Sequence, residues 1–214
     1  MRHYSRLDRL LTETQHALDV LCNQTSHPPA RPNPAEAYPE SQALSPAERA
    51  HIAALMRVNH TGEICAQALY RGQALFVRSP STREHLHQAA REEHDHLLWC
   101  QARLITLDAH TSWLNGFWYS ASFKIGVIAS LLGDDWSEGF VLETERQVES
   151  HLDQHLKDIP SQDLKTLAIL KKMREDEILH GDAAHARGAR PLPRWVRALM
   201  RAQSKVMTRL AYWI

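Results

Sequence analysis

The sequence predicts an all-α fold built around a four-helix bundle, for three reasons. No stretch of the 214 residues shows the sustained apolar–polar alternation of a strand. Helix-start and helix-stop residues bracket four long segments, expected at 46–78, 82–108, 135–158 and 162–187. Glutamate spacing is also similar in the two halves of the chain, which is typical of two helix pairs with short connections.

Particular residues mark the helix ends. Residues 45–48 (Ser-Pro-Ala-Glu) form a capping box with proline at the first helical position, and residues 81–84 (Ser-Thr-Arg-Glu) repeat the motif after Pro80. The third segment follows Gly133, and Gly188 closes the last.

Four glutamates and two histidines recur along these helices in the order E, ExxH, E, ExxH. They are Glu63, Glu93 with His96, Glu145, and Glu177 with His180. Glu63 precedes Glu93 by 30 residues and Glu145 precedes Glu177 by 32, about the length of one helix and its connection. This order is the ligand set of a carboxylate-bridged two-iron site in a four-helix bundle.

Helical phase selects these residues from five ExxH pairs in the chain. The stripe through Glu93 and His96 is apolar and faces the core; its members include Leu86, Ala89, Ala90, Leu97, Cys100 and Leu104. The stripe through Glu84 is polar and is expected to face water; its members are His87, Gln88, Arg91 and Asp95. Glu63, Glu145, Glu177 and His180 also lie on largely apolar stripes, so all six selected residues point inward.

Burying four carboxylates requires compensation, because each unpaired buried charge costs several kcal/mol. Two divalent irons would neutralise the four negative charges. Oxygen-rich ligation with one imidazole per metal suits iron or manganese, whereas structural zinc usually recruits cysteine. The sequence therefore predicts a two-metal site.

Composition places the chain among soluble or peripheral proteins, with 43% hydrophobic residues and a net charge of +0. This balance argues against nucleic acid as an electrostatic partner. We expect the charged N-terminal residues 1–22 to form a short amphipathic helix rather than a secretory signal or membrane span. Residues 27–46 contain six prolines and are expected to be an extended linker. The chain is thus divided into an N-terminal segment, 1–45, and a bundle domain, 46–214.

Two further segments are expected to face something apolar. Residues 113–132 are almost uncharged, but Asn115 and Lys124 argue against a stable span, so we expect an apolar half-helix that packs on the bundle and exposes one face to lipid. The alternative is a wholly buried helix. Residues 193–214 predict a basic amphipathic helix, with Arg194, Arg197, Arg201 and Lys205 on one stripe and Trp195, Leu199, Val206, Leu210 and Trp213 on another. Both patterns favour a membrane lipid surface as partner.

Three motifs resemble the demethoxyubiquinone hydroxylase family, the di-iron monooxygenases of ubiquinone biosynthesis. They are residues 57–63 (RVNHTGE) with 70–73 (YRGQ), residues 92–97 (EEHDHL) and residues 174–180 (REDEILH). The resemblance covers about residues 48–214. It implies a ferritin-like bundle in which the six selected residues hold two irons, and O₂-dependent hydroxylation of a polyprenylated methoxy-benzoquinol.

The resemblance also implies surroundings and partners for this site. It implies a peripheral protein on the cytoplasmic face of the cell membrane, with NADH as ultimate reductant, and it is compatible with self-association and with contacts to other ubiquinone-biosynthesis proteins. It implies that Tyr70 and His151 support the ligands or transfer protons. On the third ligand helix, counting from Leu131-Leu132-Gly133 selects Glu145, and Glu149 is the alternative on nearly the same face.

Three other functions fit parts of the pattern. One is a di-iron hydroxylase of a modified tRNA base, which the lack of net positive charge disfavours. Another is a ferritin-like protein that stores or oxidises iron, which exposed apolar segments disfavour. The third is a membrane-associated helical scaffold with structural metal.

Overall fold

The computed structural model of the chain describes residues 6–22, 28–41 and 43–214. Within these residues it contains helices and no strand, which confirms the all-α prediction. The elements are α1 (Arg6–Leu21), the 3-10 helix η1 (Pro34–Ala37), α2 (Pro46–Ala74), α3 (Pro80–Thr106), α4 (Asn115–Leu131), α5 (Asp134–Asp158), α6 (Leu164–Ala186) and α7 (Arg194–Trp213).

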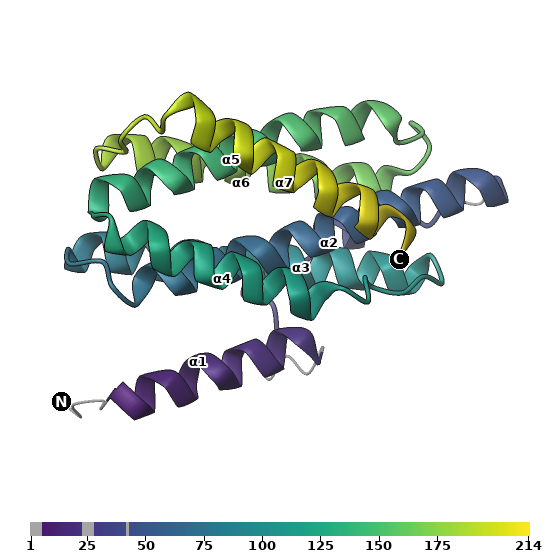
Figure 1. Cartoon of the computed structure of the whole chain (residues 1–214). Coiled ribbons are helices and arrows are strands. Elements are labelled where there is room, and N and C mark those ends of the chain that lie inside the picture. The colour runs from purple at the N-terminus through teal and green to yellow at the C-terminus, as the bar shows by residue number, and fades with distance from the viewer. Residues whose placement is uncertain (1–5, 23–27, 42) are drawn as a thin grey trace.

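Helices α2, α3, α5 and α6 form the bundle (Figure 1). α2 pairs with α3 and α5 with α6, and the two pairs meet through α2 with α5 and α3 with α6. One apolar core cluster includes Met56, Trp99, Leu152 and Leu170, and another includes Tyr70, Leu86, Val141 and Ala184. On every bundle helix the predicted ligands fall between these two clusters.

Only one of the two predicted capping boxes forms. At the start of α2, Ser45 Oγ accepts from the Glu48 backbone N–H (3.3 Å) and Glu48 Oε2 accepts from the Ser45 N–H (2.8 Å). The box at Ser81 is wrong, because α3 begins at Pro80 and its N-cap is Ser79, which accepts from the Thr82 N–H at 3.3 Å. Proline suits a first helical position, where no backbone N–H is needed.

Helix α4 lies closely along α2. A Cβ atom at Gly126 would stand 2.1 Å from the Leu69 carbonyl oxygen, and one at Gly72 would stand 2.3 Å from that of Phe123, so both positions require glycine. One face of α4 is buried, whereas Phe117, Ile128 and Leu131 are exposed. This agrees with the expected packing of residues 113–132 with one face outward.

The N-terminal part is also helical and packed. α1, a purple helix below α4 in Figure 1, contacts α2 and α4, and Glu13 Oε2 pairs with Arg71 Nε at 2.7 Å. Residues 28–41 lie against the bundle, with η1 on α6. A linker was expected here, and the observed segment is bound to the helices that carry the predicted ligands.

Helix α7 packs against α2 and α5 through its buried residues, Val196 and Ala211. Its five predicted apolar residues, Trp195, Leu199, Val206, Leu210 and Trp213, are all exposed, Trp213 to 78%. No helix among the described residues combines the length and apolarity needed to cross a bilayer.

Candidate metal centre

The six predicted ligands meet in the middle of the bundle and are all buried. They form two overlapping groups, Glu63, Glu93, His96 and Glu177 in one, and Glu93, Glu145, Glu177 and His180 in the other. Within each group the potential ligand atoms lie within 4.8 Å of one another. Four helices thus contribute to one centre, as the phase argument predicted.

Glu93 and Glu177 belong to both groups, and each divides its two oxygens between the two histidines. Glu93 Oε2 lies 3.0 Å from His96 Nδ1, and Glu93 Oε1 lies 3.2 Å from His180 Nδ1. The oxygens of Glu177 lie 3.5 Å from the same two nitrogens. Glu63 Oε2 is 3.6 Å from His96 Nδ1, whereas Glu145 Oε1 is 3.7 Å from His180 Nδ1. Glu93 and Glu177 are thus shared between the two groups, whereas Glu63 and Glu145 each belong to one group.

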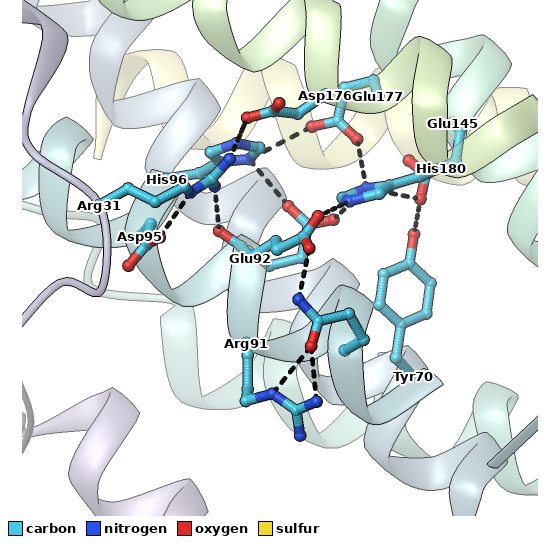
Figure 2. Close-up of polar contacts among 12 residues, drawn as sticks. Arg31, Tyr70, Arg91, Glu92, Asp95, His96, Glu145, Asp176, Glu177 and His180 are labelled. Atoms are coloured by element: carbon cyan, nitrogen blue, oxygen red, sulfur yellow. Dashed lines mark hydrogen bonds and ion pairs between the residues drawn. The ribbon is translucent and has the colours of Figure 1, made fainter. Parts of the chain in front are cut away.

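Carboxylates outside the cluster fix both imidazole rings (Figure 2). His96 Nε2 donates to Asp176 Oδ2 at 3.0 Å, and His180 Nε2 donates to Glu92 Oε2 at 2.6 Å. A carboxylate on one ring nitrogen sets the tautomer and leaves the other nitrogen to bind a metal. Both Nδ1 atoms therefore face the centre of the cluster.

Buried atoms at the centre lack hydrogen-bond partners. Among the described residues, Glu93 Oε1, Glu177 Oε2 and His180 Nδ1 make no well-directed hydrogen bond, although both oxygens lie within 3.5 Å of that nitrogen. Buried polar atoms are nearly always satisfied in folded proteins. A metal ion on the side of His180 would satisfy all three, so the residues present fit a bound metal.

Burial and mutual repulsion govern protonation in this cluster. Burial raises the pKa of Glu63 and of Glu145, and neighbouring carboxylates raise both further. Burial opposes charge on His96, but the hydrogen bond to Asp176 and the surrounding glutamates hold its pKa well above the ordinary value. The metal-free cluster therefore holds protons, which a metal would replace.

Of the two residues predicted to support the ligands, Tyr70 contacts the cluster and His151 does not. The Tyr70 hydroxyl donates to Glu145 Oε1, so Tyr70 contacts a cluster residue directly (Figure 2). His151 is in neither group; it lies in a cavity wall, with its ring centroid 4.4 Å from that of His155. The alternative ligand Glu149 lies outside the cluster and pairs with Arg174 at 3.6 Å.

One prediction about the polar stripe on α3 was wrong. Glu84 is exposed as expected, but Asp95 is only 2% exposed. Residues 30 and 31 cover it: Ala30 N donates to Asp95 Oδ1 and Arg31 Nε to Oδ2, both at 2.7 Å. Helical phase could not reveal this, because the covering segment comes from outside the helix.

A cavity of about 140 Å³ adjoins the cluster and is partly open to the surface. Glu63 belongs to both the cluster and the cavity wall. The remaining wall is mostly apolar and includes Val58, Ala66, Leu69, Ile125, Phe140 and Val148, with Met200 and Met207 contributed by α7.

Fold and site together define a four-helix-bundle protein with a buried carboxylate–histidine cluster, the architecture of di-metal carboxylate proteins. The family described as ubiquinone biosynthesis protein COQ7 matches residues 50–211, and the chain belongs to this family. The prediction of this family from three short motifs is confirmed.

Individual relatives match over almost the full length. A protein of Xanthomonas axonopodis pv. citri named 3-demethoxyubiquinol 3-hydroxylase is 52% identical over 212 residues, which are 99% of this chain and 96% of the relative. A protein of the same name from Bordetella parapertussis is 53% identical over 213 residues, 100% of this chain and 95% of the relative. The expected enzyme class, a hydroxylase, is confirmed. The similarity also includes the N-terminal segment, beyond the range expected from the motifs.

Proposed function

We propose that this chain is a di-iron monooxygenase that hydroxylates a polyprenylated demethoxyubiquinol with O₂. The division of both Glu93 and Glu177 between His96 and His180 carries this proposal. Two carboxylates that each face two sites suit a pair of ions a few ångströms apart. The family match favours this function over tRNA-base hydroxylation, iron storage and a scaffold.

Six residues would hold the two irons: Glu63 and His96 on one side of the cluster, Glu145 and His180 on the other, and Glu93 and Glu177, which belong to both groups. When bound, the irons supply the activation of O₂ that hydroxylation requires. The Tyr70 hydroxyl, by donating to Glu145 Oε1, fixes the orientation of that terminal carboxylate.

The cavity beside Glu63 is the proposed site of the quinol ring. Its volume, about 140 Å³, is close to that of an apolar cavity that holds one benzene molecule, about 150 Å³. Its apolar wall excludes water from the reacting carbon. Because the cavity is partly open and α7 forms part of its wall, we place the prenyl tail along that helix.

His151 is suited to take up the proton of a quinol hydroxyl group. It lines the cavity, and burial lowers its pKa, so its imidazole is neutral near pH 7 and can accept a proton. Gln147 and Thr144, also in the wall, offer further polar groups to orient the ring oxygens.

The exposed apolar residues of α7 support a peripheral position on the cytoplasmic face of the cell membrane. Trp195, Leu199 and Trp213 are exposed, and the helix carries five cations, Arg194, Arg197, Arg201, Lys205 and Arg209. Such helices bind anionic lipid through apolar contact and charge. α7 also lines the cavity, so a membrane-dissolved quinol could enter without crossing water. NADH as ultimate electron donor stays a prediction.

The test combines metal analysis with isotope labelling. Full-length protein purified anaerobically and loaded with Fe(II) should bind two irons and give the Mössbauer signature of a coupled pair after oxidation. With a demethoxyubiquinol and ¹⁸O₂ it should add one labelled oxygen to the ring. Binding of fewer than two irons, or a product without the label, would contradict the proposal.

A further inference from the structure

The N-terminal segment places one arginine beside the candidate metal centre, on the side of His96. Residues 28–41 lie against the bundle, and the Arg31 side chain, 29% exposed, reaches two carboxylates with little exposure, those of Asp95 and Asp176 (Figure 2). Its Nε lies 2.7 Å from Asp95 Oδ2, and its Nη1 lies 2.7 Å from Asp176 Oδ2. The guanidinium carbon also lies 5.1 Å from the ring centroid of Trp99.

Asp176 joins this arginine to the cluster. The oxygen that accepts from Arg31, Oδ2, also accepts from His96 Nε2 at 3.0 Å, and the other oxygen accepts from Lys172 Nζ at 2.7 Å. Two cations thus hold the carboxylate that orients His96. The polar partners of the Arg31 side chain are Asp95, Asp176 and the Glu92 carbonyl, none of them a cluster residue, so its effect on the metal passes through Asp176.

The two histidines are supported differently. Glu92, the partner of His180, is part-exposed, and its other oxygen accepts from the neutral side-chain amide of Gln88 at 2.5 Å. Arg31 touches Glu92 only through the backbone carbonyl, at 3.4 Å. Cationic side chains therefore bond the carboxylate behind His96, whereas the carboxylate behind His180 feels the charge of Arg31 without a side-chain hydrogen bond from it.

We propose that Arg31 is a positioning residue that strengthens metal binding at the His96 position by fixing Asp176. This inference rests on the proposed di-iron function and adds to it a role for the N-terminal segment. The planar guanidinium suits this task, because it can bond two carboxylates at fixed angles while stacking on an indole. Ala30 N, bonded to Asp95 Oδ1 at 2.7 Å, anchors the backbone beside it.

The primary test measures metal binding by full-length variants under a competing chelator, with Co(II) as an optical probe and Fe(II) for stoichiometry. Arg31→Gln should weaken one of the two metal positions by about 10- to 100-fold, the range found when a group behind a metal ligand is removed. The other position should keep its wild-type affinity. Arg31→Lys should recover only part of the loss, since an ammonium cannot bond both carboxylates in the same geometry.

Arg174→Gln is the matched control. Arg174 lies on α6, is 34% exposed and pairs with Asp153 at 2.5 Å, so it resembles Arg31 in exposure and charge. Its partners, Asp153 and Glu149, are not among the carboxylates that pair with His96 or His180. This variant should bind both metals as the wild type does.

A double-mutant cycle tests the route through Asp176. If Arg31 acts through that carboxylate, the losses of metal affinity in Arg31→Gln and Asp176→Asn should be strongly non-additive in the double variant. Additive losses, or wild-type affinity at both positions in Arg31→Gln, would overturn the inference. Helicity by circular dichroism separates loss of binding from loss of folding.

Failure of this inference differs from failure of the proposed function. Wild-type protein that binds no metal pair would refute the di-iron proposal itself. Wild-type protein that binds two metals, together with an Arg31→Gln variant that does the same with equal affinity, would refute only the role of Arg31.

Discussion

Glu145 and Glu149 lie one helical turn apart on α5 but in different surroundings. Glu145 is buried within the cluster, 3.7 Å from His180 Nδ1. Glu149 has a side chain 35% exposed and lies beside Arg174 at the surface. Four residues advance about 6 Å along a helix, so two carboxylates on nearly the same face cannot both lie level with the centre.

Glu145→Gln should lose most of the metal held with His180, because the variant removes a terminal anionic ligand. Glu149→Gln should keep two metals per chain. Inductively coupled plasma analysis of Fe(II)-loaded protein distinguishes them. The opposite pattern would transfer the ligand role to Glu149.

Glu177→Ala should weaken metal binding at both positions, since the Glu177 carboxylate belongs to both groups. His180→Ala should weaken metal binding only at the position that His180 shares with Glu145. Titration with Co(II) under a chelator would show two weakened sites in the first variant and one in the second, and hydroxylation should be abolished in both. Full iron content with normal turnover in Glu177→Ala would exclude it as a ligand.

Gly62→Leu should block the cavity while leaving the metal centre intact. Gly62 lines the cavity, and a Cβ atom placed on it meets no atom within 4 Å, so the new side chain enters open space. We expect the KM for a demethoxyubiquinol to rise at least about tenfold, as expected for a steric loss above about 1.4 kcal/mol.

Gly62→Ala is the control for this variant. It adds one methyl group and removes a glycine from a helix interior, which should stabilise the fold by up to about 1 kcal/mol. Its KM should stay close to wild type. Unchanged kinetics in Gly62→Leu would mean that the ring binds elsewhere.

His155 should make the fold less stable in mild acid. Burial lowers its pKa from about 6.5 to about 3, and its Nδ1 donates to Asn59 Oδ1 at 3.0 Å. Between these two pKa values the unfolded chain binds a proton at His155 that the folded chain does not. The free energy of unfolding is therefore highest above about pH 6.5 and declines as the pH falls toward 3. From pH 7 to 5 the loss should be about 1–2 kcal/mol.

Urea unfolding at pH 7 and pH 5 measures this loss. His155→Gln can keep a donor for Asn59 but cannot titrate, so its stability should decrease less than that of the wild type over this range. His110→Gln, which replaces an exposed histidine, should behave as the wild type does. An equal decrease in His155→Gln and wild type would contradict the assignment.

Helix α7 should bind anionic lipid vesicles. In flotation with vesicles containing phosphatidylserine, the full chain should rise with the lipid at low salt and less so at high salt, because each cation near the surface contributes about 1 kcal/mol. Replacing Trp195 and Trp213 together by serine should reduce flotation, whereas Ile105→Ser, an exposed apolar residue on α3, should not. No flotation of wild-type protein would remove the membrane surface from the proposal.

The six cluster residues could be predicted from sequence because their signal is local. Glu93 and His96 lie one turn apart on one helix, so the periodicity of neighbouring apolar residues fixes their direction. Each other ligand also sits on its own apolar stripe. Which acid orients which histidine depends on contacts between α3 and α6, because His96 pairs with Asp176 and His180 with Glu92.

The sequence could not show that the N-terminal segment, residues 1–45, docks on the bundle. Its five prolines predict an extended backbone, which is compatible with a free linker and with a segment bound to a bundle. Only the packed structure places Arg31 over Asp95 and Asp176, 64 and 145 residues further along the chain. That contact also buries Asp95, which the helical phase of its own segment predicted to face water.

The sequence by itself determined the helices, the inward direction of six ligands and the family, because periodicity and short motifs depend on residues close together in the chain. The tertiary structure alone decided which carboxylates are shared, which acid orients each histidine, that α7 forms a cavity wall, and that an N-terminal arginine supports the centre. These features depend on the relative rotation and docking of separate segments, which the packing of the whole chain sets.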